Sequence, residues 1–188
     1  MRLFIAVWVK EELREAVAKF LEEMSLQAEG IKWTPPEQLH FTLKFLGEQR
    51  PELVKELFPV LAEAGRQEPG FSLSLGKGGV FPGWQSPRIL WLGPDQGGKE
   101  LRSLAQRISQ GIADNGLLPD EHAKEKRSFS PHLTIGRVKG SAPVFNRLLL
   151  TGGVQGSMTV DGFSLVESLL TPQGPVYKEI QRFSLSRS

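Results

Sequence analysis

Two histidine–threonine pairs stand out as residues whose types and spacing could do chemistry. His40 and Thr42 lie in LHFTLKFLG, and His132 and Thr134 lie in PHLTIGRVK. Near neutral pH one imidazole can accept a proton while a second, protonated imidazole supplies one. The threonine hydroxyls can donate hydrogen bonds to a charged oxygen without ionising. Together these groups favour an in-line displacement at phosphorus over acyl transfer.

Each pair lies in an alternating segment that is typical of a half-buried strand. Side chains alternate between the two faces of a strand, so a histidine and a threonine two positions apart share one face. The two pairs are 92 positions apart in a chain of 188 residues, which predicts two similar halves facing each other across a cleft. The apolar residues of the same segments are expected in the core: Phe41, Leu43, Phe45, Leu133 and Ile135.

The chain resembles the two-histidine (2H) phosphoesterase superfamily through these motifs. The opening MRLFIAV, LHFTLKFLGE, RILWLG, FSPHLTIGRVK and the late GPVY narrow the resemblance to the RNA 2',3'-cyclic phosphodiesterases, also called 2'-5' RNA ligases (LigT-like). The resemblance implies hydrolysis of a terminal 2',3'-cyclic phosphate to a 2'-phosphate, with weak reverse 2'-5' ligation. It implies RNA ends or nucleotides as partners, and neither a metal nor another cofactor.

The resemblance also implies roles for particular residues. His132 is the expected base and His40 the acid that expels the ribose O3', although the symmetry of the motifs leaves these roles open to exchange. Thr42 and Thr134 are expected to hold phosphate oxygens. Related enzymes have an arginine near the phosphate at the position of Arg137. Strand alternation places Arg137 opposite His132, so it could reach the cleft only at the strand end or beyond a bulge, which Gly136 would permit.

Two other functions compete with this interpretation. A metal-dependent phosphohydrolase could use His40, His132 and the third histidine, His122, which lies in a long polar segment from Gly116 to Pro131. Few carboxylates lie near the motifs to complete such a site. A non-catalytic module that binds RNA ends is the second alternative. Two complete histidine–threonine pairs argue against it, because binding alone needs no acid and base.

Composition limits the class of protein. The net charge of +2 does not by itself require nucleic acid, so RNA contacts would come from local patches such as Lys124–Arg127, Arg137 and Lys139. The absence of cysteine excludes disulfides, thiolate nucleophiles and zinc–thiolate sites. No apolar run approaches the roughly 18 residues that span a bilayer. We expect a cytoplasmic monomer that does not associate with membranes.

The elements that position the motifs predict an α+β fold. Helices are expected over Glu11–Leu26, from Pro51 to a kink or end near Pro59, over Lys99–Ile112 and over Pro143–Leu150. Strands are expected over Leu39–Leu46, Phe71–Leu75 and Arg88–Leu92, with a glycine loop around Lys77 and a hairpin of Gly162–Leu170 with Val176–Leu185. We predict one domain, residues 1–188, built as two pseudo-symmetric lobes of antiparallel sheet with outer helices and an active-site cleft between them.

Overall fold

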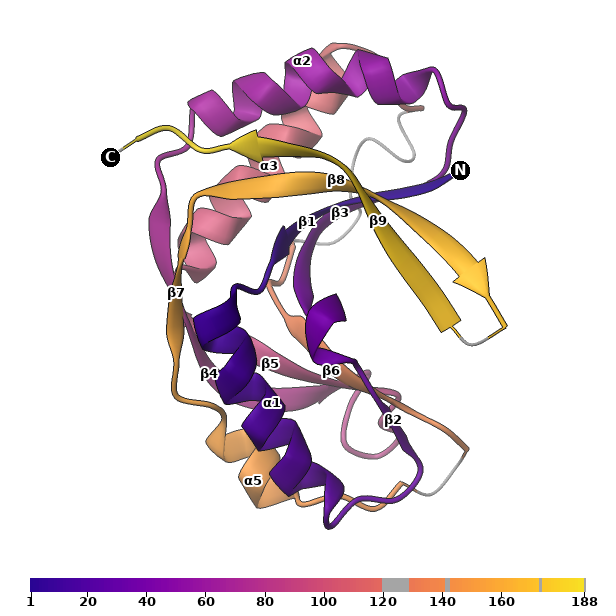
Figure 1. Ribbon diagram of the computed structural model, residues 1–188, viewed down its shortest axis with the longest axis vertical. Helices are drawn as coiled ribbons and strands as arrows, with labels where there is room; N and C mark the ends of the chain where they lie inside the picture. Colours follow the sequence, from indigo (N-terminus) through magenta and orange to yellow (C-terminus); the bar gives the residue numbers. More distant parts are fainter. Residues whose placement is uncertain (120–128, 141–142, 173, 188) are drawn as a thin grey trace.

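The computed structural model describes residues 1–119, 129–140, 143–172 and 174–187, and the predicted α+β fold is confirmed. A nine-stranded antiparallel sheet curls through the molecule (Figure 1). One lobe holds β1 (Arg2–Trp8), β3 (His40–Glu48), β8 (Gly162–Thr171) and β9 (Gly174–Ser184). The other holds β2 (Ile31–Trp33), β4 (Phe71–Phe81), β5 (Ile89–Gln96), β6 (Leu133–Val138) and β7 (Ser157–Val160).

The strand order interleaves the two halves of the chain. It runs β7-β4-β5-β6-β3-β1-β8-β9, and β2 adds to β6. The predicted hairpin of β8 and β9 therefore joins the lobe of β1 and β3, while β4, from the first half of the chain, joins the lobe of β5 and β6. The lobes meet where β3 pairs with β6, at the single partner pair Phe41 and Leu133. The two motif strands are thus neighbours at the centre of the sheet.

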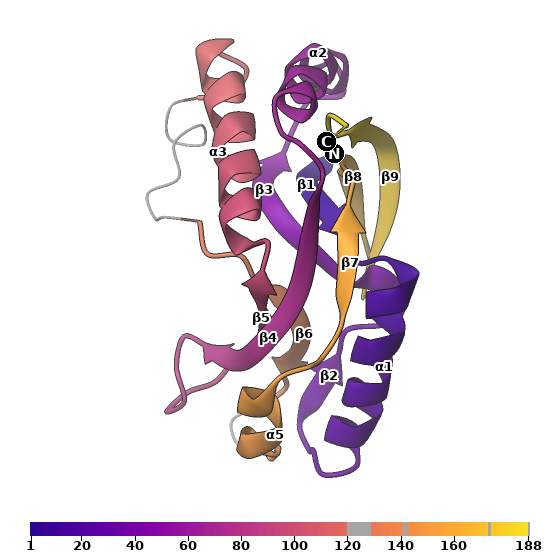
Figure 2. The same cartoon turned by 90° about the vertical axis from the view of Figure 1, so that its left-hand side faces the viewer.

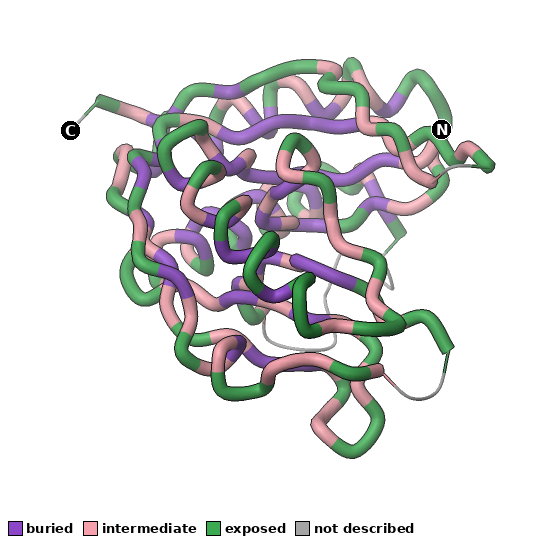
Figure 3. The backbone as a smooth tube through the Cα atoms, turned by 60° about the horizontal axis from the view of Figure 1, so that its bottom comes forward, coloured by how far each residue is buried: buried purple, intermediate pink, exposed green. Residues whose placement is uncertain are grey.

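The helices pack on different parts of this sheet (Figure 2). Helices α2 (Leu53–Arg66) and α3 (Gly98–Asp114) contact each other and cover β9, β3 and β5. Helix α1 (Glu11–Ser25) lies beside β7, and α5 (Arg147–Gly152) lies beside β4. Buried residues occur in both the strands and the helices, and they alternate along the chain with exposed ones (Figure 3). Within the described residues, no helix is long and apolar enough to cross a membrane.

Strand β1 is buried on both faces, as its unbroken apolar sequence suggests. Leu3, Ile5 and Val7 point into the main core. Phe4 and Ala6 point to the other face, where they form a small second cluster with Val166. This second cluster supports the concave face of the sheet on which the histidines lie.

Two local expectations are not met. The helix does not end near Pro59, because α2 continues through this residue, although an interior proline costs about 3 kcal/mol. Its neighbours Leu57 and Leu61 are fully buried, and burial of each contributes about 1.5–3 kcal/mol, which outweighs that cost. The glycines around Lys77 are not a loop but part of β4. A Cβ at Gly79 would lie 2.5 Å from the Trp91 ring, so glycine is needed there for close packing.

Candidate active site

The pairing of β3 with β6 brings the two motifs together. Phe41 and Leu133, the residues between histidine and threonine in each motif, are direct partners and fully buried. The flanking side chains therefore point to the opposite, concave face. His40, Thr42, His132 and Thr134 all line one cavity of about 310 Å³ on that face.

Both imidazoles are held in the same way by the backbone. His40 Nδ1 lies 2.7 Å from the carbonyl oxygen of Gln38, and His132 Nδ1 lies 2.8 Å from that of Ser130. A carbonyl oxygen only accepts hydrogen bonds, so Nδ1 carries the proton and donates it in each case. This leaves Nε2 of each neutral ring free to accept a proton, and Nε2–H of each charged ring free to donate one.

A bulge in β3 changes which residues face the cavity. Consecutive residues of β1 pair with Thr42 and Lys44, so Leu43 is an extra residue. Leu43 and Lys44 are both buried as a result, and Phe45 returns to the face of His40. Phe45 is 52% exposed and lines the cavity, so its predicted place in the core is wrong.

A matching bulge in β6 does the same for Arg137. Consecutive residues of β5 pair with Gly136 and Thr134, so Ile135 is the extra residue. Arg137 therefore lies on the side of His132 and lines the cavity, as the sequence allowed only beyond a bulge. Gly136, which adjoins this bulge, also has a packing role. A Cβ there would lie 2.9 Å from the Ile31 side chain, so the glycine lets β2 approach β6.

Phe45 and Arg137 occupy equivalent positions in the two motifs, each five residues after its histidine. Because β3 and β6 are antiparallel, equal steps along them lead in opposite directions. The two side chains therefore mark opposite ends of the site, with the histidines and threonines between them.

Aromatic rings surround the histidines. His40 packs against Phe4, Trp8 and Tyr177, with ring centroids 5.1, 5.4 and 5.3 Å away. Burial lowers the pKa of His40, and the positive charges of Arg137 and His132 lower it further. The hydrogen bond to the carbonyl of Gln38 opposes this shift without reversing it. His40 therefore stays neutral down to a lower pH than an ordinary histidine does.

The cavity is suited to an anion. Three cationic side chains line it, those of Arg2, Lys32 and Arg137, and the described lining residues include no carboxylate. The described part of the chain holds no group of three or more His, Cys, Asp or Glu side chains that could bind a metal. His122 and the basic segment 124–127 lie outside the described residues. The three-histidine site therefore remains an open hypothesis.

Comparison with known proteins follows the same division of the chain. The sequence profile described as LigT-like phosphoesterase matches residues 7–91 and again residues 92–177, so each match contains one histidine–threonine pair. The chain belongs to the LigT-like phosphoesterase family.

Several known proteins match the chain over nearly its whole length. It is 37% identical to an RNA 2',3'-cyclic phosphodiesterase of Archaeoglobus fulgidus, covering 97% of this chain and 99% of the relative. Its fold matches the crystal structure of TT0787 from Thermus thermophilus with a TM-score of 0.82 and 32% identity, over 100% of both chains. Escherichia coli LigT complexed with 3'-AMP matches with a TM-score of 0.73 and 29% identity, over 98% of this chain and 97% of LigT.

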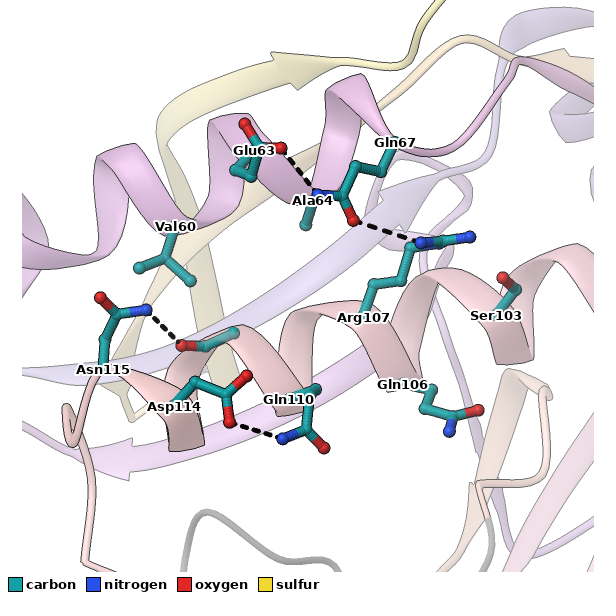
Figure 4. Close-up of a pocket in the computed structure, with 11 residues that line it drawn as sticks. Val60, Glu63, Ala64, Gln67, Ser103, Gln106, Arg107, Gln110, Asp114 and Asn115 are labelled. Atoms are coloured by element: carbon teal, nitrogen blue, oxygen red, sulfur yellow. Dashed lines mark hydrogen bonds between the residues drawn. The ribbon is translucent and has the colours of Figure 1, made fainter.

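A larger hollow of about 550 Å³ lies between α2 and α3 (Figure 4). Its polar side chains largely satisfy one another. Gln110 donates to Asp114 at 2.6 Å and Arg107 donates to Gln67 at 3.2 Å. Arg107 is also ion-paired with the buried Glu68 at 2.8 Å. No histidine lines this hollow, whereas both motif histidines line the smaller cavity.

Four residues on the wall of that cavity are not expected there from the sequence, which instead places Phe45 in the core. They are Arg2, Lys32, Phe45 and Tyr177. The equal five-residue offset of Phe45 and Arg137 from their histidines is a sequence signal that could have placed Phe45 in the site. Tyr177 lies in the GPVY segment, which carried the family resemblance without a role for its tyrosine.

Proposed function

We propose that this chain is an RNA 2',3'-cyclic phosphodiesterase that opens the terminal cyclic phosphate of RNA ends or nucleotides and leaves a 2'-phosphate. One observation carries the proposal. Two imidazoles, each with Nδ1 held by a backbone carbonyl so that Nε2 can exchange a proton, share a cationic cavity with two threonine hydroxyls. The name of the Archaeoglobus fulgidus relative supports the same substrate class.

In this mechanism the cyclic phosphate lies between the two motif strands. Thr42, Thr134 and Arg137 donate hydrogen bonds to its non-bridging oxygens, and each bond to a charged oxygen contributes about 1.5–3 kcal/mol. One imidazole takes a proton from water as the water oxygen bonds to phosphorus. The other gives its proton to the ribose oxygen as the bond from phosphorus to that oxygen breaks. With a 5'-hydroxyl in place of water, the same displacement of O3' joins the two ends through a 2'-5' bond, and the base takes the proton of that hydroxyl.

We assign His132 as the base and His40 as the acid that protonates O3'. The free Nε2 atoms fit either order, and the low pKa of His40 favours its neutral form before substrate binds. A bound phosphate places a negative charge beside the imidazole and raises its pKa, which restores the proton that an acid needs.

The identity of the product tests the proposal. An oligonucleotide ending in a 2',3'-cyclic phosphate is incubated with the protein, and the product is treated with a phosphatase that removes only 3'-phosphates. We expect a ring-opened product that resists this phosphatase. An authentic 3'-phosphate oligonucleotide serves as the positive control. Release of phosphate from the enzymatic product would show that O2' leaves instead, and an unopened ring would refute the activity.

The pH dependence should reflect the lowered pKa of His40. The pair is active when it holds one proton in total, so a second proton bound at low pH removes the base. We therefore expect kcat/KM to rise with pH through a midpoint below 6.5, the ordinary value for histidine. Measured rates of cyclic phosphate opening across the acidic range test this. A midpoint above 6.5 would contradict it.

Phe45 offers a face for the nucleobase at its end of the site. Its ring is half exposed in the cavity, and the Arg2 guanidinium lies 5.0 Å from its centroid. Stacking of a base on an aromatic ring is worth about 1–3 kcal/mol, so Phe45→Ala should lower kcat/KM for nucleoside cyclic phosphates by about 5- to 150-fold. Methyl riboside 2',3'-cyclic phosphate, which lacks a base, is the control. An equal loss on that substrate would assign Phe45 a structural role.

A further inference from the structure

Lys32 and Arg137 form a pair of cations on one wall of the active-site cavity. They are direct partners in the antiparallel pairing of β2 with β6, and both line the cavity. Directly opposed residues of neighbouring strands project from the same face, and like charges in such positions destabilise each other. An anion bound beside both cations turns this repulsion into attraction.

The ammonium group of Lys32 lies close to the β8–β9 hairpin. A Cβ built on Gly174 would be 3.1 Å from Lys32 Nζ, so the side chain reaches the tip of the β8–β9 hairpin. Nearby, the Gln38 side-chain amide donates to the carbonyl of Pro175 at 3.3 Å. Lys32 and Pro175 both line the cavity, so the charge of Lys32 lies where β2 and this hairpin approach each other.

The direction of the substrate follows from the two ends of the site. With the cyclic phosphate between the histidines and the base on Phe45, the ribose must present its C5' side away from Phe45. This is because the base is attached to C1' and C5' to C4', the two ring carbons that flank the ring oxygen. The opposite end holds Arg137 and, beyond it, Lys32. In an RNA end, the group on C5' is the phosphodiester that leads to the preceding nucleotide.

We propose that Lys32, together with Arg137, forms a second phosphate subsite that binds the phosphate on C5' of the terminal nucleotide. This rests on the function proposed above and narrows its substrate class to oligonucleotide ends. The cyclic phosphate carries a single negative charge, whereas three cations line the cavity without a carboxylate among the described lining residues. A second phosphate would add a second negative charge beside Lys32 and Arg137.

Three substrates that differ only on C5' test the subsite. They are a nucleoside 2',3'-cyclic phosphate, the same compound with a 5'-phosphate, and a dinucleotide ending in the cyclic phosphate. We expect kcat/KM to be about 5- to 20-fold higher for the second and third than for the first, an ion-pair effect reduced by solvent exposure. Lys32→Gln should remove most of this gain, and Lys32→Arg should keep it. Lys55→Gln, an equal charge change on the exposed surface of α2, should leave it intact.

Salt provides an independent readout. A phosphate contact releases counterions, so kcat/KM for the dinucleotide should depend more strongly on salt than kcat/KM for the nucleoside 2',3'-cyclic phosphate. The slope of log kcat/KM against log salt concentration should be more negative by about 0.7. Lys32→Gln should abolish that difference while its melting temperature stays near that of the wild type. Equal kcat/KM for all three substrates, or a gain that survives in Lys32→Gln, would overturn the subsite but leave the phosphodiesterase activity standing. Failure of the wild type to open any of the three would refute the activity itself.

Discussion

Replacing His40 or His132 should lower kcat for cyclic phosphate opening by about 10²- to 10⁴-fold, the usual cost of losing a general acid or base. The expectation depends on the shared geometry of the two rings. Each Nδ1 is committed to a backbone carbonyl, at 2.7 Å for His40 and 2.8 Å for His132, so Nε2 is the only ring nitrogen left for chemistry. No other described imidazole lines the cavity to take over the lost role.

Asparagine is the matched replacement for this experiment. Its side-chain amide can still donate to the carbonyl of Gln38 or Ser130, but it cannot carry a proton between water and a leaving group. His40→Asn and His132→Asn should therefore keep the wild-type fold, as seen by circular dichroism and melting temperature. The double variant should be little slower than the slower single variant, because the acid and the base act as a unit. A single variant with wild-type kcat would refute the two-histidine mechanism.

The fold could be predicted from local patterns because most of the strands and helices have unambiguous periodicity. The motif strands and the C-terminal hairpin are examples. The wrong predictions share one cause, which is that tertiary packing overrode a local rule. Pro59 stays inside α2 because its neighbours are buried. The glycines near Lys77 belong to β4 because Gly79 lies against the ring of Trp91.

The site was harder to predict because alternation along a strand fails at a bulge. Extra residues at Leu43 and Ile135 reverse the faces that follow them, and this moves Phe45 and Arg137 onto the cavity wall. A bulge depends on how a strand pairs with its neighbours, which no single segment of sequence reveals. The same holds for Lys32, whose position beside Arg137 depends on the pairing of β2 with β6.

The distinct roles of the two histidines can be separated by changing the leaving atom. In a substrate whose O3' is replaced by sulfur, the departing group is a thiolate, which is a far weaker base than an alkoxide and needs no proton from the enzyme. A variant without its acid should therefore recover most of its lost 10²- to 10⁴-fold rate on this substrate. A variant without its base should not, because attack by water still requires proton removal.

We expect His40→Asn to recover on the 3'-sulfur substrate and His132→Asn to remain slow, because His40 is the proposed acid beside O3'. The measurement is kcat for each variant on the oxygen and sulfur substrates, with the wild type as the reference for the intrinsic effect of sulfur. Recovery of His132→Asn alone would exchange the two roles. If neither variant recovers on the 3'-sulfur substrate but one does on the 2'-sulfur isomer, then O2' leaves and the predicted 2'-phosphate product is wrong. Recovery of neither variant on either isomer would mean that the second histidine is not a general acid.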